Sequence, residues 1–293
     1  MSPVSPAQQA LLDWYAATAR DLPWRAPGAS PWAVMVSEFM LQQTPVTRVL
    51  PVFTTWLGRW PTASALAADP AGEAVRAWGR LGYPRRALRL HSAARVITDR
   101  HAGEVPLDLA DLRSLPGVGE YTAAAIASFA HRQRHVVLDT NVRRVLSRAH
   151  DGRARPSASV LAVERTRAAA LLPADARTAA RWSVAVMELG ALVCAPSKPA
   201  CNACPLAESC SWRAAGYPPP AVPARRAQPY DGTDRQCRGR LLALLQASPG
   251  AVPRPSLEEV WSDAEQRERA LDGLVADGLV ESLAGEMFAL PGL

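Results

Sequence analysis

The chain has 293 residues, a formal net charge of +6 and 48% hydrophobic residues, which suits one large domain or two to three small ones. This apolar content excludes a disordered chain. No apolar run reaches the ~18 residues of a transmembrane helix, and the N-terminus lacks the pattern of a secretory signal, so we expect a cytoplasmic protein.

The positive charge is carried almost wholly by arginine. Of the 33 basic residues, only Lys198 is a lysine. Because a guanidinium stays protonated, arginine cannot form a Schiff base, and a mechanism that needs a catalytic side-chain lysine has one candidate. The basic balance is compatible with a nucleic-acid partner, although many basic proteins bind none.

Helical periodicity dominates up to residue 234, and we therefore predict a mainly α fold. Ser30-Pro31 and Thr44-Pro45 each have the pattern of an N-cap followed by proline at the first helical position. The clearest predicted helices cover residues 45–59, 85–98, 120–131, 141–149 and 158–171.

Glu38 lies in the apolar segment AVMVSEFML. Burial would raise the pKa of this carboxyl, which suits a general acid near neutral pH. The alternative is a structural one, in which Ser37, Glu38 and Gln42 form the polar stripe of an amphipathic helix.

The segment LPGVG at residues 115–119 separates two predicted helices. Gly117 and Gly119 permit a tight turn, and the helix that begins at Glu120 presents free N–H groups and a positive dipole end. A helix-hairpin-helix of this kind suits a DNA phosphate, held through Gly117, Val118 and Gly119, without reading sequence. The alternative is an ordinary turn between helices.

Asp139 follows the apolar run HVVL and precedes a predicted helix, so the simplest interpretation is an N-cap. The same position has a functional interpretation, because helix N–H groups would lower the pKa of the carboxyl and keep it ionised. One carboxyl with a raised pKa and one with a lowered pKa is the pattern expected for cleavage of a glycosidic bond.

Four cysteines, Cys194, Cys201, Cys204 and Cys210, follow a C-x6-C-x2-C-x5-C spacing. Structural zinc usually uses two short cysteine pairs, whereas a [4Fe–4S] cluster accepts these long and unequal spacers. We therefore favour the cluster over zinc. Lys198, inside the first spacer, is expected either to reach a phosphate or to be a solvated loop residue.

Residues 216–234 are rich in proline and predict a semi-rigid linker. The 59 residues from 235 to 293 predict helices near 235–247, 255–262 and 264–277 and a hairpin at 279–290. This pattern resembles a winged-helix module, and a generic helical cap is an equal alternative. Cys237, beyond the linker, is not expected to bind the metal.

Taken together, the motifs resemble one family over about residues 8–213. They are SEFMLQQT, LGYPRRALRLH, LPGVGEYTAAAI, LDTNVRRVL, MELGALVC and the cysteine spacing. They resemble the MutY-type adenine DNA glycosylases of the helix-hairpin-helix superfamily, which are related to endonuclease III. The resemblance implies a monofunctional enzyme of base excision repair that removes adenine mispaired with 8-oxoguanine or guanine in double-stranded DNA. A bacterial, nucleoid-associated monomer is expected.

The resemblance also implies roles for individual residues. Glu38 corresponds to the acid that protonates adenine N7, Asp139 to the carboxylate that stabilises the sugar cation, and Asn141 to its support. Tyr121 corresponds to a catalytic-site tyrosine beside the reaction centre, and it stands where lyase-active relatives carry a Schiff-base lysine. The residues expected to line the adenine pocket are Leu22, Trp24, Arg25 and Glu188. Those expected to wedge into the duplex beside 8-oxoguanine are Gln43, Thr44, Leu81 and Tyr83.

The implied organisation has two lobes and a short C-terminal module. Residues 1–27 and 137–215 would form the iron–sulfur domain, and residues 28–136 the six-helix domain with the hairpin. Two features depart from the family: Pro84 replaces a usual tyrosine, and residues 235–293 are too short for the MutT-like domain that many members carry. Recognition of 8-oxoguanine would then come from the wedge or from the short module.

Three other functions compete with this one. An endonuclease III-like glycosylase and lyase for damaged pyrimidines is disfavoured by Tyr121 and by the LDTN motif. A non-enzymatic iron–sulfur regulator would bind DNA through the C-terminal module, regardless of the mispair. A small electron carrier is disfavoured by the extent of DNA-facing helix.

Overall fold

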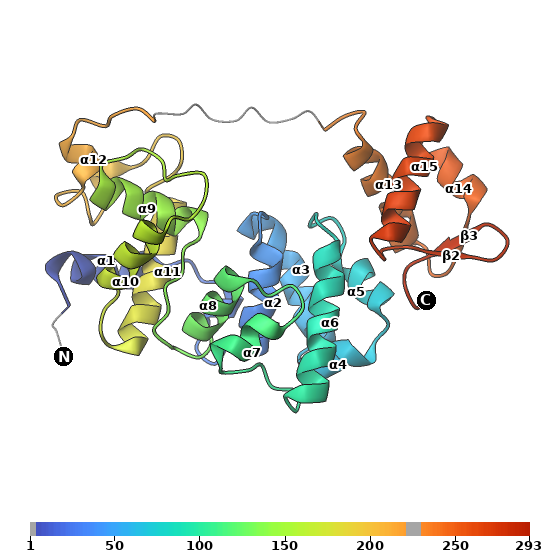
Figure 1. Cartoon of the computed structure of the whole chain (residues 1–293), viewed down its shortest axis with the longest axis horizontal. Coiled ribbons are helices and arrows are strands. Elements are labelled where there is room, and N and C mark those ends of the chain that lie inside the picture. Colours follow the sequence, from blue (N-terminus) through green and yellow to red (C-terminus); the bar gives the residue numbers. More distant parts are fainter. Residues whose placement is uncertain (1–3, 221–229) are drawn as a thin grey trace. The chain divides into compact units, whose positions relative to one another are not determined.

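The computed structural model describes residues 4–220 and 230–293, and within them the chain is mainly helical (Figure 1). The predicted linker, residues 216–234, therefore lies partly outside the described residues. The described residues group into two units, one of residues 4–29, 107–113 and 118–220, the other of residues 30–106, 114–117 and 230–293. No helix in the described part of the chain is long and apolar enough to cross a membrane. The mainly α fold class is confirmed.

The first unit is built around the pair of helices α9 and α11, with α1 packed on α11. Apolar side chains of these three helices, such as Leu11, Val145 and Leu189, form its core. Its helices are α1 (Pro6–Thr18), α8 (Glu120–Phe129), α9 (Thr140–Asp151), α10 (Ala162–Leu171), α11 (Ala176–Leu192) and α12 (Ser211–Ala214), with short 3-10 turns at Pro23–Arg25 and Cys201–Ala203.

The second unit has a core rich in tryptophan. The ring of Trp56 meets the rings of Trp60 and Trp78 edge-on, with centroids 4.7 and 5.7 Å apart, an arrangement that aromatic pairs favour. Its first helices are α2 (Pro31–Leu41), α3 (Val46–Arg59), α4 (Ala63–Ala68), α5 (Ala71–Trp78) and α6 (Arg85–Arg100). Helix α7 (Leu109–Ser114) follows α6 in the chain.

Most predicted helix starts are confirmed, and two are wrong. Ser30 caps α2, and its hydroxyl accepts the N–H of Ala33 at 3.1 Å. Thr44 does not cap α3, because Pro45 is the cap residue and the helix begins at Val46. The predicted helix at 158–171 is also shorter than expected, since α10 begins only at Ala162.

The C-terminal residues contain the three predicted helices, here α13 (Asp234–Ala247), α14 (Arg254–Val260) and α15 (Ala264–Ala276). The predicted hairpin is present as β2 (Glu281–Leu283) and β3 (Met287–Ala289), and a third strand, β1 (Val252–Pro253), pairs antiparallel with β3. We call residues 234–293 the C-terminal module. It groups with residues 30–106; its winged-helix character and the predicted domain boundaries remain predictions.

Candidate active site

Asp139 is fixed at the start of α9 by two hydrogen bonds. The backbone N–H of Val142 donates to its Oδ1 at 2.6 Å, and the side-chain amide of Asn141 donates to its Oδ2 at 2.9 Å. Desolvation nevertheless raises the pKa of Asp139 above its ordinary value, because it outweighs these bonds. The predicted cap is confirmed, and the predicted lowering of the pKa is wrong.

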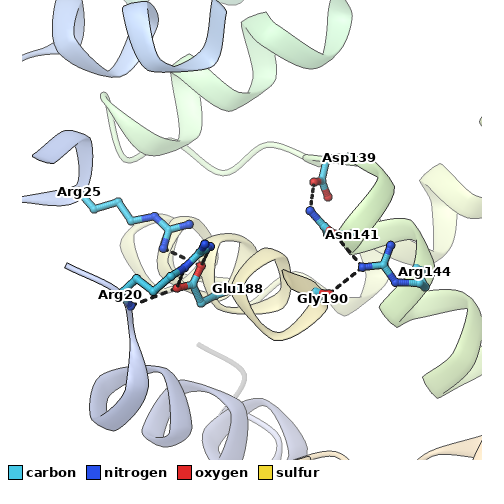
Figure 2. A network of polar contacts seen from close by, with 7 residues as sticks. All are labelled: Arg20, Arg25, Asp139, Asn141, Arg144, Glu188 and Gly190. Carbon is cyan, nitrogen blue, oxygen red and sulfur yellow. Dashed lines mark hydrogen bonds and ion pairs between the residues drawn. The ribbon is translucent and has the colours of Figure 1, made fainter. Parts of the chain in front are cut away.

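Arg144 holds Asn141 from behind and is itself buried, with 8% of its surface exposed. Its guanidinium donates to Asn141 Oδ1 at 2.7 Å and to the carbonyl oxygens of Gly190 and Cys194, each at 2.7 Å. Figure 2 shows the series of hydrogen bonds that leads from Asp139 through Asn141 and Arg144 to Gly190. The orientation of the carboxylate is thus tied to the end of α11 and to the first cysteine. Sequence reasoning missed Arg144, which stands within the LDTNVRRVL motif.

Glu188 lies on α11 with its side chain fully buried. It accepts two hydrogen bonds from the guanidinium of Arg20, at 2.7 and 2.6 Å, and one from Arg25 at 2.9 Å (Figure 2). Desolvation raises the pKa of Glu188, but these two arginines outweigh it and lower the pKa to about 2. The pairing of Glu188 with Arg25 joins two predicted pocket residues, and Arg20 is a partner that no motif indicated.

The other two predicted pocket residues, Leu22 and Trp24, lie in the same short segment of the chain as Arg25. Both are buried, at 4% and 7% exposure. Pro23 starts a 3-10 turn there, and the N–H of Arg25 donates to the carbonyl of Leu22 at 2.8 Å. This turn therefore fixes the backbone from which Arg25 reaches Glu188.

Glu38 is buried in α2, with 6% of its surface exposed. Every residue of this helix from Trp32 to Met40 is buried, so Glu38 does not belong to a solvent-facing polar stripe. Ser37 beside it is fully buried and donates to the carbonyl of Val34 at 2.7 Å. A buried carboxyl in this apolar helix is compatible with the functional interpretation, in which Glu38 acts as a general acid.

Tyr121 lies in the first turn of α8 and is half-buried. It packs against a small buried cluster of Ala124, Ala125 and Val137. Glu38 and Asp139 belong to different units.

The predicted wedge residues divide into an exposed pair and a buried pair. Gln43 and Tyr83 are exposed and have left-handed backbones, with φ of 56° and 49°. Thr44 and Leu81 are only 6% and 3% exposed, and the Thr44 hydroxyl donates to the Leu81 carbonyl at 3.2 Å. The buried pair thus joins the two loops, and only the exposed pair presents side chains to solvent.

In the predicted hairpin, Gly117 and Gly119 have different tasks. Gly117 has a φ of 78°, and a Cβ there would lie 2.8 Å from Arg89 Cβ and 3.0 Å from a Phe39 ring atom. Gly119, the cap residue of α8, has an extended backbone that any residue can adopt, so it is not needed for the turn. No atom lies within 4 Å of a Cβ at Gly119, and Val118 beside it is buried, so the open backbone can approach a phosphate.

The four cysteines of the predicted cluster lie near one another. Burial raises the pKa of Cys204 to about 11, and the charges of Cys194, Cys210 and Cys201 add to this effect. Arg148 donates to Cys194 Sγ at 3.4 Å, as a cation would beside a cluster with negatively charged sulfur ligands. Within residues 4–220 and 230–293, however, no three His, Cys, Asp or Glu side chains are placed to hold a metal ion. The donor set, four thiols in one loop region, fits the cluster chemically.

Two further cluster-region predictions can be placed. Lys198 is exposed and has a left-handed φ of 51°, which agrees with both alternatives, the phosphate contact and the solvated loop lysine. Cys237 is fully buried in α13, which is consistent with its exclusion from the ligand set.

Comparison with known proteins identifies the family. The model described as "HhH-GPD superfamily base excision DNA repair protein" matches residues 36–168. The protein of Mycobacterium tuberculosis (strain ATCC 25618 / H37Rv) named adenine DNA glycosylase is 54% identical over 283 residues, covering 96% of this chain and 92% of that protein. The relative of the same name from Mycolicibacterium smegmatis is 54% identical and covers 99% and 97% of the two chains. The human relative is 41% identical over 69% of this chain and 38% of its own length.

Solved structures agree on the fold. A thermostable thymine-DNA glycosylase superposes with a TM-score of 0.63 at 24% identity, covering 71% of this chain and 95% of that one. A non-covalent endonuclease III–DNA complex gives a TM-score of 0.60 at 24% identity, covering 74% and 99%. At this identity the likeness concerns the fold alone.

Proposed function

The chain belongs to the HhH-GPD superfamily of base excision DNA repair proteins, and we propose that it acts as a monofunctional adenine DNA glycosylase. Its substrate is double-stranded DNA in which adenine is mispaired with 8-oxoguanine or guanine. The observation that carries the proposal is the Asp139 carboxylate, fixed at the start of α9 by Val142 and Asn141. The buried Glu38 supplies the second carboxyl.

The two carboxyl groups divide the work of breaking the N-glycosidic bond. Glu38 donates a proton to N7 of the adenine, so that the base leaves as a neutral molecule. Asp139 is the anion that stabilises the positive charge developing on the deoxyribose, and Asn141 keeps its oxygens aimed. Water then completes an abasic site. Because Asp139 has a raised pKa, its ionisation, and with it the excision rate on the acid side of the pH profile, is expected to rise with pH.

The adenine must leave the base stack to reach these groups. We assign the pocket for the flipped base to Leu22, Trp24, Arg25 and Glu188, where the buried carboxylate of Glu188 orients Arg25. Gln43 and Tyr83 are the side chains that enter the duplex, since both are exposed on left-handed loop positions. Gly117, Val118, Gly119 and Lys198 contact phosphates.

We assign a [4Fe–4S] cluster to Cys194, Cys201, Cys204 and Cys210. When bound, it would order the loop that carries Lys198, and hydrolysis needs no electron transfer from it. Arg144 connects this region to the active carboxylate, because it donates both to the Cys194 carbonyl and to Asn141.

A single-turnover assay tests the function. Short duplexes would carry adenine opposite 8-oxoguanine, adenine opposite guanine, or an oxidised pyrimidine. We expect strand breaks on the two adenine duplexes only after alkali, with the faster rate opposite 8-oxoguanine. We also expect no covalent DNA complex after borohydride, because Tyr121 stands where a Schiff-base lysine would be needed. Breaks without alkali on the pyrimidine duplex would instead establish a lyase of the endonuclease III type.

Equal rates on the two adenine duplexes would retain the enzyme and overturn the preference for 8-oxoguanine. Binding without excision on any duplex would overturn the enzyme itself.

A further inference from the structure

The C-terminal module is joined to α5 by hydrogen bonds that satisfy helix ends on both sides. The N–H of Gly72, in the first turn of α5, donates to the carbonyl of Pro291 at 2.7 Å. In return, Arg76 of α5 donates to the carbonyl of Gln246 at 2.8 Å and to that of Ser248, at the end of α13. Because helix ends leave backbone groups without intrahelical partners, each element supplies what the other lacks.

Gln246 extends this contact to the other end of α5. Its side-chain amide donates to the carbonyl of Val75 at 2.7 Å and to that of Gly79 at 3.4 Å. Gly79 is the first residue of the loop that carries Leu81 and Tyr83. We call residues 79–84 the wedge loop.

Five consecutive carbonyl groups of the wedge loop each accept a hydrogen bond. Gly79 accepts from Gln246, Arg80 from Arg48, and Leu81 from Thr44. Gly82 accepts from the Trp78 indole at 3.0 Å, and Tyr83 from the N–H of Arg86 at 3.0 Å. The first donor, Gln246, belongs to the C-terminal module. The other four donors lie within residues 30–106 of the same unit.

The wedge loop needs this support because its backbone is unfavourable. Gly79, Gly82 and Tyr83 have φ of 53°, 85° and 49°, and for a tyrosine the left-handed region is strained. The ring of Tyr83 is 58% exposed, with the Arg86 guanidinium 4.4 Å from its centroid. An exposed aromatic on a strained backbone stays in place only when its surroundings fix the loop.

A second contact meets the other end of the loop. Arg85, directly after Pro84, pairs with Asp277 at 3.2 Å, and Arg238 of α13 pairs with the same carboxylate at 2.6 Å. The module therefore contacts the wedge loop at its first residue, Gly79, and the chain directly after it at Arg85.

The charge of the module disfavours a direct role in binding DNA. Residues 234–293 contain six arginines and ten Asp or Glu, a net charge of −4, whereas the whole chain carries +6. A surface that reads a polyanion is normally basic. We therefore look for the role of the module in its contacts with α5 and the wedge loop.

We propose that the C-terminal module, through Gln246, holds the wedge loop in the conformation that exposes Tyr83 and so sets discrimination at the base opposite the adenine. The effect on discrimination rests on the proposed function. The claim that the module fixes the conformation of the wedge loop does not. Gln246 is a positioning residue, since it acts on DNA only through the loop.

The sharpest variant is Gln246→Glu, which keeps the size of the side chain and replaces the donor with an oxygen that repels the Gly79 carbonyl. The matched control is Gln236→Glu, on the same helix, because the side chain of Gln236 bonds to Gly232 and Asp231, neither of which belongs to α5 or the wedge loop. A second variant, Gly72→Ala, favours α5 by itself, but its Cβ would lie 2.8 Å from the Pro291 carbonyl and from Leu293. All are made in the full chain.

The first readout is hydrogen–deuterium exchange of the peptide that spans residues 76–86. We expect exchange to become about three- to tenfold faster in Gln246→Glu and Gly72→Ala, as the loss of a hydrogen bond or two allows, and to be unchanged in Gln236→Glu. Unchanged exchange in both test variants would overturn the proposal, whether or not the chain excises adenine.

The second readout is the ratio of single-turnover excision rates for adenine opposite 8-oxoguanine and opposite guanine. We expect Gln246→Glu to lower this ratio about fivefold or more, with the guanine duplex hardly affected, while Gln236→Glu keeps the wild-type ratio. Faster exchange with an unchanged ratio would overturn the assignment to discrimination. Failure of the proposed function is recognised separately, since the wild type itself would then excise nothing.

Discussion

At the scale of single residues, the candidate site is built from buried charged side chains, each held by defined partners. Glu188 is the clearest, because it is fully buried, paired with Arg20 and Arg25, and has a pKa lowered to about 2. Asp139 shows the opposite balance, since desolvation raises its pKa despite two hydrogen bonds. Burial thus acts on both carboxyl groups, and the neighbouring charges decide whether the pKa ends below or above its ordinary value.

The Glu188 network predicts how stability depends on acid. A carboxyl whose pKa is lower in the folded state contributes stability that is complete above its ordinary pKa of 4.5 and is lost as the pH falls toward about 2. We expect the free energy of unfolding to fall by about 2–3 kcal/mol across this window for this group alone. Urea denaturation at several pH values measures it.

The control compares two substitutions. Glu188→Gln should remove this part of the acid dependence and destabilise the chain at neutral pH, because it leaves Arg20 and Arg25 without their partner. Glu259→Gln, at an exposed position of α14, should leave the acid profile unchanged. Identical acid profiles for wild type and Glu188→Gln would show that the ion pairs do not hold in solution.

At residue scale, sequence reasoning found the chemical groups and the support by Asn141, and missed two of the supporting arginines. Glu38, Asp139 and the four cysteines stand out because a charged or thiol side chain lies in an unusual context. Arg20 and Arg144 do not, because an arginine in an arginine-rich chain gives no signal until its partners, distant in sequence, are known. The direction of the Asp139 pKa could not be predicted either, since it is set by burial that only the fold decides.

At the scale of elements, the crossing of α9 and α11 positions the active carboxylate. A Cβ at Gly190 of α11 would lie 2.7 Å from Asn141 Cβ and 2.9 Å from its carbonyl oxygen. Only glycine permits this approach, and the Gly190 carbonyl then accepts from Arg144 at 2.7 Å.

Gly190→Ala should therefore separate the two helices. We expect it to destabilise the chain by about 1–3 kcal/mol, as overpacking in a core does, and to slow adenine excision by shifting Asn141. Gly58→Ala is the matched change, because Gly58 is also helical and no atom lies within 4 Å of a Cβ there. That substitution should stabilise by roughly 0.5–1 kcal/mol. If both substitutions stabilise, as followed by urea denaturation, the close crossing is not present in solution.

Elements were predicted well where local chemistry decides and less well where tertiary contacts do. Ser30 and Asp139 are caps as expected, because a side-chain oxygen can reach the next N–H groups in any context. Thr44 had the same local pattern, but its hydroxyl donates to the distant Leu81 carbonyl. Leu81, expected in the wedge, is likewise buried because its loop folds against α3.

At the scale of the whole molecule, the assigned cluster makes a prediction about iron. We expect the purified chain to contain about four iron atoms, as a [4Fe–4S] cluster requires, and Cys204→Ser to lose most of them. Cys237→Ser is the control, since Cys237 is buried in the C-terminal module and is not in the ligand set. Equal iron content in the two variants, measured by elemental analysis, would exclude the assigned ligands.

The whole-molecule organisation was the part least open to sequence reasoning. The three helices and hairpin of residues 235–293 could be predicted from periodicity, because each is a local pattern. Their attachment to α5 could not, since it is carried by backbone groups of Gly72, Val75 and Gly79, and backbone groups leave no mark in a sequence.

The most direct test of the central claim is the single-turnover rate of adenine excision by Asp139→Asn. The control is Asp175→Asn. Asp175 caps α11 through the Thr178 N–H as Asp139 caps α9, so this substitution makes the same chemical change at an exposed helix start. We predict a loss of roughly a thousandfold or more for Asp139→Asn, with DNA binding retained, and the wild-type rate for Asp175→Asn. Excision by Asp139→Asn at the wild-type rate would contradict the account.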